Sequence, residues 1–167
     1  MYDKLTQSDI QKMKEELEYR KVELRKQLLE DVKETRAHGD LSENFEYHAA
    51  KREKNKNESR IRYLERMIRT AQVIDDSSKE DEVGMNDKIE IYFEEDDMTE
   101  SYRIVTTVRS NSLNGLISIE SPMGKALLGH KVGDRVEIQV NASYSYYVVI
   151  QSIDKTQDDS EDKIRSY

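Results

Sequence analysis

The sequence predicts an α+β protein in which a long antiparallel helical hairpin precedes a small antiparallel-sheet domain with one short helix. Three observations predict this division. Apolar residues recur at helical spacing through most of residues 1–74, an acidic stretch without periodicity follows over residues 75–84, and short runs rich in Ile, Val, Tyr and Thr occupy residues 85–155. Residues 156–167 form an acidic tail, which we expect to be frayed.

Composition limits both the size of the core and the kinds of site. The 167 residues are 37% charged and 35% hydrophobic, which is too polar for one large core but suits an exposed hairpin and a small domain. The chain has no cysteine, so disulfides, thiolate zinc sites and a cysteine nucleophile are excluded. It also lacks a run of about 18 apolar residues and an apolar leader, so we expect a cytoplasmic protein without membrane contact.

The first helix is predicted from about Ser8 to Arg36. A Ser-x-x-Gln capping box begins at Ser8, and the next Gly or Pro is Gly39, where a left-handed residue would end the helix. At ~1.5 Å per residue this helix is roughly 43 Å long, which places the following bend far from a compact domain. Its apolar stripe consists of Ile10, Met13, Leu17, Leu24, Leu28 and Val32.

A second helix is predicted to run from the bend to about Ile74. Asp40 and Glu43 fit a second capping box, with the acid three residues after the N-cap. Steps of three and four then define a heptad seam, which should face the first stripe as an antiparallel coiled coil. The seam consists of Tyr47, Ala50, Lys54, Asn57, Ile61, Leu64, Ile68 and Ala71. We expect its polar members, Lys54 and Asn57, to fix the register at a cost in stability.

Five short strands and one short helix are predicted after the acidic stretch. The strands are expected at residues 88–93, 101–108, 115–119, 135–140 and 144–153. Ser121 and Pro122 suit the N-cap and first position of a helix over residues 123–128, which Gly129 would end. This helix should cover one face of the sheet.

Charge is unevenly distributed along the chain. The net charge of −8 argues against a nucleic-acid partner for the protein as a whole, yet residues 51–69 contain eight basic and three acidic residues. The local net charge there is therefore +5, against −13 for the remainder. A solvated coiled-coil flank with i,i+4 ion pairs explains this stripe as well as contact with RNA phosphates does.

Asp40 and Glu43 are the candidate metal-binding residues. Capping alone would explain an Asp at the N-cap and a Glu three residues later. Alternatively, two carboxylates at this spacing point outward together and could give one or two oxygens to Mg²⁺, which keeps waters and phosphates as its other ligands. Two carboxylates do not complete such a site. The HExxH, GxSxG, GxGxxG and P-loop motifs are all missing from the sequence, so it offers no enzyme motif of its own.

Two stretches in this order resemble one known family. The first reads Arg36-Ala37-His38-Gly39-Asp40-Leu41-Ser42-Glu43-Asn44, followed by Glu46-Tyr47 and Ala49-Ala50-Lys51. The second reads Gly115-Leu116-Ile117-Ser118-Ile119-Glu120-Ser121-Pro122-Met123-Gly124-Lys125-Ala126-Leu127-Leu128-Gly129, followed by Val132-Gly133-Asp134. They are similar to the coiled-coil tip and the C-terminal signature of the bacterial transcript cleavage factors, the Gre family.

The resemblance implies an FKBP-like C-terminal domain and a hairpin that enters the secondary channel of RNA polymerase. Asp40 and Glu43 would then assist cleavage of backtracked RNA, with a Mg²⁺ ion shared with the polymerase active site and no cofactor of the protein's own. The protein would be a catalytic accessory rather than an enzyme, and we expect a monomer. Contact with the nascent RNA 3′ end is expected from Arg36, Lys51 and Arg52, and docking to polymerase from Glu120, Ser121, Pro122 and Met123.

Two departures from the family pattern leave other functions open. Residues 109–111 are Arg-Ser-Asn where the family commonly has an acidic Glu-Ala-Asp loop, so the contact surface of the small domain is expected to differ. Arg25-Lys26 stands where Arg-Pro is frequent. One alternative is a paralogue that occupies the channel and inhibits transcription. Another is a coiled-coil scaffold or chaperone-like protein without a polymerase partner.

Overall fold

The computed structural model describes residues 3–39 and 44–166, and the chain divides into two compact units. Asp3 and Asp9–Gln72 belong to the first, which we call the hairpin unit, and Lys4–Ser8 with Val73–Ser166 belong to the second, the sheet unit. Two short strands, β1 (Lys4–Leu5) and β2 (Gln72–Val73), pair with each other to form a two-stranded sheet. The predicted fold class, a long hairpin followed by a small sheet domain with one short helix, is confirmed.

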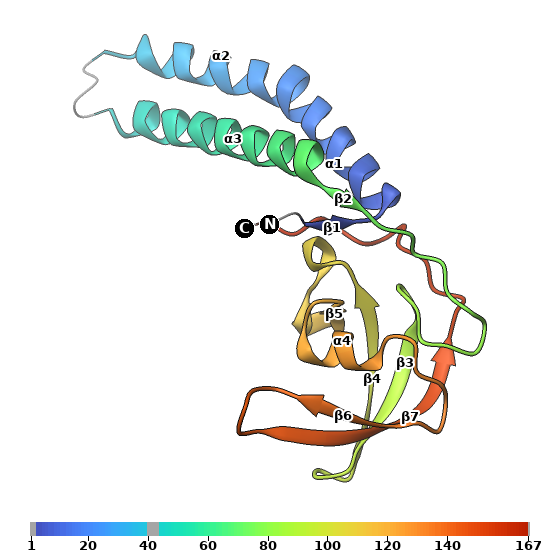
Figure 1. The fold of residues 1–167 in the computed structure, drawn as a ribbon. Coiled ribbons are helices and arrows are strands. Elements are labelled where there is room, and N and C mark those ends of the chain that lie inside the picture. Colours follow the sequence, from blue (N-terminus) through green and yellow to red (C-terminus); the bar gives the residue numbers. More distant parts are fainter. Residues whose placement is uncertain (1–2, 40–43, 167) are drawn as a thin grey trace. The chain divides into compact units, whose positions relative to one another are not determined.

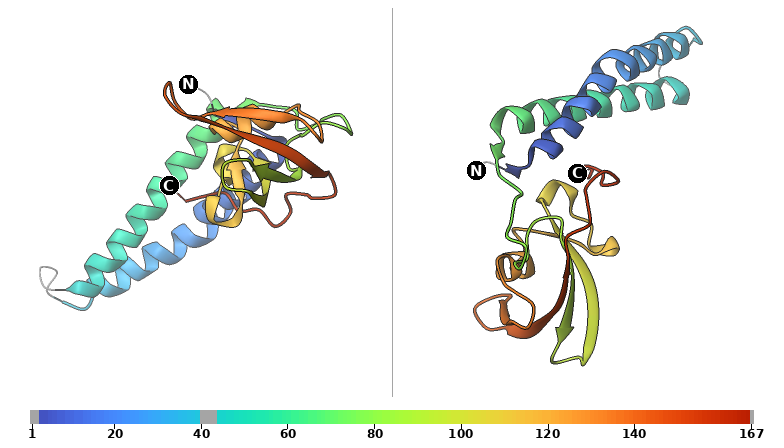
Figure 2. Two further views of the ribbon diagram at one scale, coloured as in Figure 1. Left: turned by 90° about the horizontal axis from the view of Figure 1, so that it is seen from below. Right: turned by 90° about the vertical axis from the view of Figure 1, so that its right-hand side faces the viewer.

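The hairpin unit consists of two antiparallel helical arms. The first comprises α1 (Gln7–Tyr19), a π-helical turn (Arg20–Leu24) and α2 (Arg25–Arg36). The second is α3 (Phe45–Thr70), which runs beside α2 in all views (Figures 1 and 2). Every residue of the two predicted seams is buried or half-buried, because the heptad spacing keeps the seams on facing sides. The second helix ends at Thr70 rather than Ile74, since residues 72–73 are extended.

The π-helical turn interrupts the first arm beside a polar seam residue, where an uninterrupted helix was predicted. The Arg25 N–H donates to the Arg20 carbonyl, the five-residue closure of a π turn. That carbonyl also accepts from Asn57 Nδ2 at 3.1 Å, while Arg20 Nη1 donates to Asn57 Oδ1 at 3.0 Å. Asn57 is 3% exposed, so its amide is satisfied only when it lies opposite this turn. Asn57, a polar seam residue expected to fix the register of the two arms, therefore does so through its contact with Arg20.

Ion pairs between the arms surround this polar contact. Arg25 donates through Nε and Nη2 to both carboxylate oxygens of Glu58, each at 2.9 Å. Arg60 makes the same two-pronged contact with Glu16 at 3.1 Å. The Glu58 hydrogen bonds raise the pKa of Arg25, and those of Arg25 lower the pKa of Glu58. Arg60, one of the eight basic residues between positions 51 and 69, therefore stabilises the contact between the two arms.

The sheet unit is a five-stranded mixed sheet with the order β5-β4-β3-β7-β6. Its elements are β3 (Lys88–Phe93), β4 (Met98–Val105), β5 (Leu116–Ser118), α4 (Pro122–Leu127), β6 (Arg135–Gln139) and β7 (Ser145–Asp154). The sheet was predicted to be antiparallel, but β5 pairs parallel to β4. Two 3₁₀ turns, Thr107–Arg109 and Ser112–Asn114, separate these strands and allow the chain to return in the same direction.

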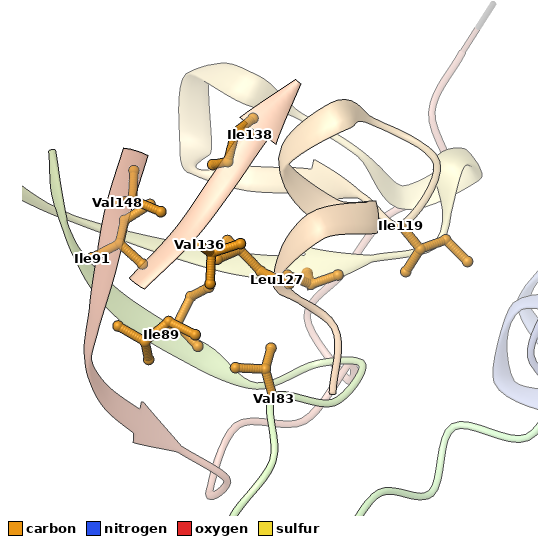
Figure 3. Close-up of a cluster of buried hydrophobic side chains, with 10 residues drawn as sticks. Val83, Ile89, Ile91, Ile119, Leu127, Val136, Ile138 and Val148 are labelled. Carbon is orange, nitrogen blue, oxygen red and sulfur yellow. The ribbon is translucent and has the colours of Figure 1, made fainter. Parts of the chain in front are cut away.

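The core of the sheet unit lies between the sheet and α4. Ile89 and Ile91 are buried while Lys88 and Glu90 on the same strand are exposed, the alternation of a sheet with one covered face. Figure 3 shows the side chains that meet these isoleucines from other elements. They include Val83, Ile119, Leu127, Val136, Ile138 and Val148, all less than 9% exposed.

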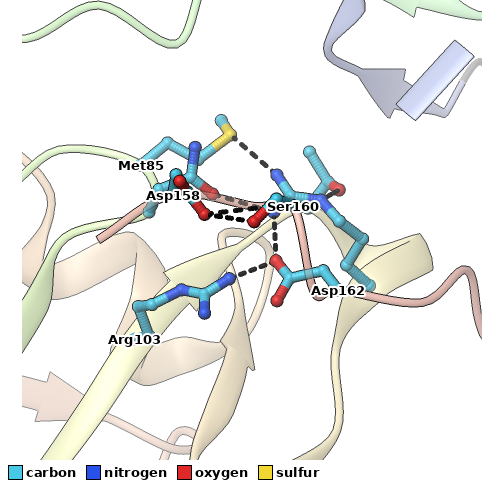
Figure 4. A network of polar contacts seen from close by, with 8 residues as sticks. Met85, Arg103, Asp158, Ser160 and Asp162 are labelled. Atoms are coloured by element: carbon cyan, nitrogen blue, oxygen red, sulfur yellow. Dashed lines mark hydrogen bonds and ion pairs between the residues drawn. The ribbon is translucent and has the colours of Figure 1, made fainter. Parts of the chain in front are cut away.

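The C-terminal tail is ordered against the sheet unit, so the expected fraying is wrong for its middle part. The Asp162 side chain is 5% exposed and forms ion pairs with Arg103 and Arg109 (Figure 4). The backbone N–H of Arg165 donates to the Val108 carbonyl at 2.8 Å. An acidic composition suggested solvation, but one carboxylate of the tail is instead shared by two arginine side chains of the sheet unit.

Candidate functional site

The tip of the hairpin is the candidate site, and its two acidic residues, Asp40 and Glu43, lie outside the described residues. The ends of the two helices that flank them are described. The first arm ends at Arg36, after which Ala37 and His38 complete hydrogen-bonded turns onto carbonyls of the last helical turn. Gly39 follows with φ +118°, a conformation that favours glycine, as expected for the residue that ends this arm.

Asn44 links the two arms at the base of the tip. Its Oδ1 accepts from the Tyr47 N–H at 3.0 Å, which is the N-cap bond of α3. Its Nδ2 donates to the Thr35 carbonyl at 2.7 Å, so the same side chain also contacts the last turn of α2, at a carbonyl that accepts from the His38 N–H as well. One amide group therefore fixes how the two helices approach each other below the acidic residues.

This arrangement corrects the predicted capping box. The N-cap of α3 is Asn44, four residues after Asp40, and the helix begins at Phe45. Sequence reasoning preferred Asp40 because the acid at Glu43 completed the pattern, yet the tip contains a second good N-cap residue. Asn44 prevails because it can also donate to Thr35 across the hairpin. The N-cap position of α3 is therefore taken by Asn44 and not by Asp40.

Substitutions at Asn44 test this role. Asn44→Ala should lower the stability of the first turn of α3 by about 1 kcal/mol, so amide exchange at Tyr47 should rise by about fivefold. Asn44→Asp keeps the acceptor for the Tyr47 N–H and removes only the donor to Thr35, so Tyr47 should stay protected. Amide hydrogen exchange by NMR measures both. Unchanged Tyr47 protection in Asn44→Ala would show that another group caps α3.

The basic residues beside the tip are more exposed than Arg60, which lies farther along α3. Arg36, Lys51 and Arg52 are exposed, and within residues 3–39 and 44–166 none of them forms an ion pair. Arg60, by contrast, is 7% exposed and paired with Glu16. The three residues predicted to contact RNA are thus available to an anionic partner.

No complete metal site is present among the described residues, where no group of three or more His, Asp or Glu side chains is arranged to hold an ion. Beside the tip, His38 Nδ1 and Glu46 Oε2 lie 3.5 Å apart, and both side chains are exposed. In the same described part of the chain, no helix is long and apolar enough to span a bilayer.

The predicted docking residues lie at the start of α4 and have two different roles. Ser121 Oγ accepts from the Gly124 N–H at 3.0 Å as the N-cap, and Met123 packs against the core. A Cβ at Gly124 would lie 2.0 Å from the Ser118 carbonyl oxygen, so only glycine allows α4 this close to β5. Glu120 and Pro122 are exposed and form the part of this segment that a partner can reach.

Arg109, in the loop that departs from the family pattern, belongs to the interior. Its side chain is fully buried and donates to Asn86 Oδ1 at 2.8 Å and Asp162 Oδ2 at 2.7 Å. Burial would raise the pKa of Asp162, but hydrogen bonds from Arg103 and Arg109 outweigh it and lower that pKa below its ordinary value. Arg109 itself therefore cannot contact a partner, and the expected change of contact surface stays a prediction for Ser110 and Asn111. Sequence reasoning missed the pairing because 53 residues separate the partners.

Comparisons with known proteins give a consistent result. A model described as "Transcription elongation factor, N-terminal" matches residues 4–73, and one described as "Transcription elongation factor, GreA/GreB, C-term" matches residues 78–155. Similar proteins named "Transcription elongation factor GreA" include that of Thermoanaerobacter pseudethanolicus, 45% identical over 83% of this chain and 88% of the relative. That of Rhizobium etli is 39% identical over 90% and 98%.

Two solved structures also resemble the chain. The GreA factor homolog 1 (Gfh1) protein of Thermus thermophilus is 28% identical, with a TM-score of 0.43, over 92% of this chain and 99% of its own. The elongation factor GreA/GreB from Nitrosomonas europaea is 25% identical, with a TM-score of 0.39, over 56% of this chain and 78% of its own.

Proposed function

Because the chain belongs to the GreA/GreB family of transcription elongation factors, we propose that it stimulates cleavage of backtracked RNA by RNA polymerase, with its hairpin tip as the active part. RNA polymerase is the partner, and the nascent RNA 3′ end is the substrate that the two proteins share. In this proposal the protein acts as a monomer and as an accessory factor, with Asp40 and Glu43 supplying only part of a metal site.

The observation that supports this function best is the cap at Asn44. Asn44 already caps α3 and holds the Thr35 carbonyl, so the acidic residues between Gly39 and Asn44 are not needed to begin the helix. Acidic residues free of that role can take part in metal chemistry. The first arm spans Gln7 to Arg36, about 45 Å at ~1.5 Å per residue, so the tip can act deep within a partner's channel.

Asp40 and Glu43 would hold a Mg²⁺ ion together with carboxylates of the polymerase. The two ions of such a site would together supply activation of the attacking water and stabilisation of the leaving oxygen. The role of this chain is to deliver one or two negatively charged oxygens, which Mg²⁺ prefers, at the end of a braced hairpin. Arg36, Lys51 and Arg52 would bind RNA phosphates and hold the 3′ segment beside the acids.

Docking through the start of α4 gives a separate test of the function. Glu120→Lys combined with Pro122→Ala should raise the protein concentration needed for half-maximal RNA cleavage by about tenfold. This corresponds to ~1.4 kcal/mol, a loss typical of the few interface residues that carry most of the binding energy. Cleavage at saturation should be unchanged, since the tip is intact. Cleavage by stalled elongation complexes, measured over a range of protein concentrations, gives both quantities.

Glu137→Lys is the matched control, because Glu137 is exposed on β6 and the change in charge is the same. It should leave the half-maximal concentration unaltered. Equal curves for the parent and the double variant would disprove docking through residues 120–123. Absence of any stimulation by the parent would instead favour a protein that occupies the channel without promoting cleavage.

A further inference from the structure

A small aromatic and acidic pocket in the sheet unit lies outside the regions already discussed. Its volume is about 120 Å³, and we call it the tyrosine pocket. The residues that line it are Phe93, Glu95, Asp96, Tyr144, Tyr146 and Tyr147. We propose that the tyrosine pocket binds the guanidinium group of an arginine presented by a protein partner. This inference does not depend on the chemistry of the tip.

Aromatic rings form the walls of the tyrosine pocket. The rings of Phe93 and Tyr146 stack with centroids 6.0 Å apart and an interplanar angle of 28°, and Tyr144 lies 6.0 Å from Tyr146. Phe93 and Tyr146 also pack against the hydrophobic core, so their positions are fixed by the fold. Ring faces carry partial negative charge and attract cations, especially the planar guanidinium of arginine.

Carboxylates lie at the rim of the same pocket. Glu95 Oε2 accepts from the Tyr144 hydroxyl at 3.2 Å, which orients the acid beside the ring. Residues 94–97 are four consecutive acids in the turn between β3 and β4, so the local field repels anions and attracts cations. Within the described chain, neither Glu95 nor Asp96 is paired with a cation, and both side chains are exposed. The tyrosine pocket thus combines aromatic faces with available negative charge.

The neighbouring surface already binds a guanidinium in this way. The Arg135 guanidinium lies 3.8 Å above the centroid of the Tyr147 ring. Arg135 Nε donates to Glu94 Oε2 at 2.7 Å, and this hydrogen bond raises the pKa of Arg135. Tyrosine and glutamate thus hold a cation together on one side of Tyr147. The tyrosine pocket repeats that combination with Tyr144 and Glu95 and is open to a side chain from outside.

The size of the tyrosine pocket indicates what it can accept. Its volume of about 120 Å³ is well below the roughly 300 Å³ at which small-molecule sites begin. A single side-chain head group fits such a space, whereas a nucleotide does not. Arginine is favoured over lysine because its planar group is weakly hydrated and stacks on rings while it donates to a carboxylate.

An NMR titration of the full-length protein tests the proposal with the probe acetyl-Gly-Arg-Gly-amide. Amide shifts should change at residues 93–96 and 144–147, with a Kd on the order of 1–10 mM, because exposed cation–π contacts and ion pairs are individually weak. The arginine δ-methylene protons should move upfield, as protons above aromatic rings do. Acetyl-Gly-Gln-Gly-amide should bind at least about tenfold more weakly, and added salt should weaken binding of the arginine peptide.

Two variants and one control complete the test. Tyr144→Ala, and separately Glu95→Gln with Asp96→Asn, should each weaken arginine-peptide binding by about fivefold. All three side chains are exposed, so the fold should be retained, which unchanged amide shifts elsewhere would verify. Asp76→Asn with Glu80→Gln removes the same charge from an exposed segment of the sheet unit and should have no effect.

Equal binding of the arginine and glutamine peptides would overturn the proposal, as would wild-type affinity in the pocket variants. In sedimentation experiments the parent should not self-associate through this pocket, so Tyr144→Ala should leave its oligomeric state unchanged. Such self-association would assign the tyrosine pocket to a second copy of this chain and overturn the assignment to a separate partner.

Discussion

Asp162→Ala should destabilise the sheet unit by about 3 kcal/mol, because it leaves the Arg103 and Arg109 guanidinium groups without their shared carboxylate. The Arg109 side chain is fully buried and that of Arg103 is 15% exposed, so water cannot replace the lost partner fully. Amide hydrogen exchange in β3 and β7 should therefore accelerate by on the order of 100-fold. The hairpin amides should be unaffected.

Glu161→Ala is the matched control, since Glu161 is the exposed neighbour of Asp162 and has the same charge. It should change stability by less than about 0.5 kcal/mol. Equal exchange rates in both variants would show that the tail contributes nothing to the sheet unit and would restore the expectation that it is frayed.

The Asp162 contribution should also depend on pH. The folded-state pKa of Asp162 is lowered, so the native state binds its proton less readily than the unfolded chain. The contribution is fully present above the unfolded pKa of about 3.9 and is lost as pH falls through the folded value. The difference in unfolding free energy between the parent and Asp162→Asn should accordingly stay constant from pH 5 to pH 8 and shrink below about pH 4.

The hairpin was largely predictable because its information is local. Seam residues such as Ile61 and Leu64 recur at heptad spacing, and that spacing alone places them on one side of α3. The π turn at Arg20–Leu24 has no such local signal, since it depends on the amide of Asn57 from the other arm. The start of α3 was similarly decided by the contact between Asn44 and Thr35 across the hairpin.

In the sheet unit, too, local patterns were predictable from the sequence and contacts between distant residues were not. Alternation at Ile89 and Ile91 predicted β3 to the residue, whereas periodicity could not reveal that β5 runs parallel to β4. The role of Arg109 was hidden because its partner Asp162 lies in a segment whose composition suggested disorder. The tip acids were recognised by family resemblance, and Asp40 and Glu43 lie outside the described residues, so their metal-binding role stays a prediction.

Asp40→Asn with Glu43→Gln should remove most of the stimulation of RNA cleavage while leaving polymerase binding intact. Both substitutions keep the size and polarity of the side chains and remove only the charges that a metal requires. Because Asn44 caps α3, the hairpin should keep its helicity and melting temperature. The loss in activity should be on the order of 10–100-fold, the range seen when a supporting group of a metal site is removed.

Competition separates this loss from a failure to bind. The double variant should displace the parent from RNA polymerase at the concentration the parent itself requires, since the α4 segment and the basic residues of the hairpin are unchanged. Higher Mg²⁺ should restore part of the activity, because a weakened site fills at higher metal concentration. A variant that neither competes nor responds to Mg²⁺ would point to a damaged hairpin rather than a missing ligand.

The role of the hairpin tip is tested most directly by the rate of RNA cleavage in a backtracked elongation complex at limiting Mg²⁺, with saturating parent or double variant. The proposed role for Asp40 and Glu43 predicts strong stimulation by the parent and on the order of 10–100-fold less by Asp40→Asn with Glu43→Gln. Full stimulation by the double variant would contradict it and would leave the tip acids without a part in the chemistry.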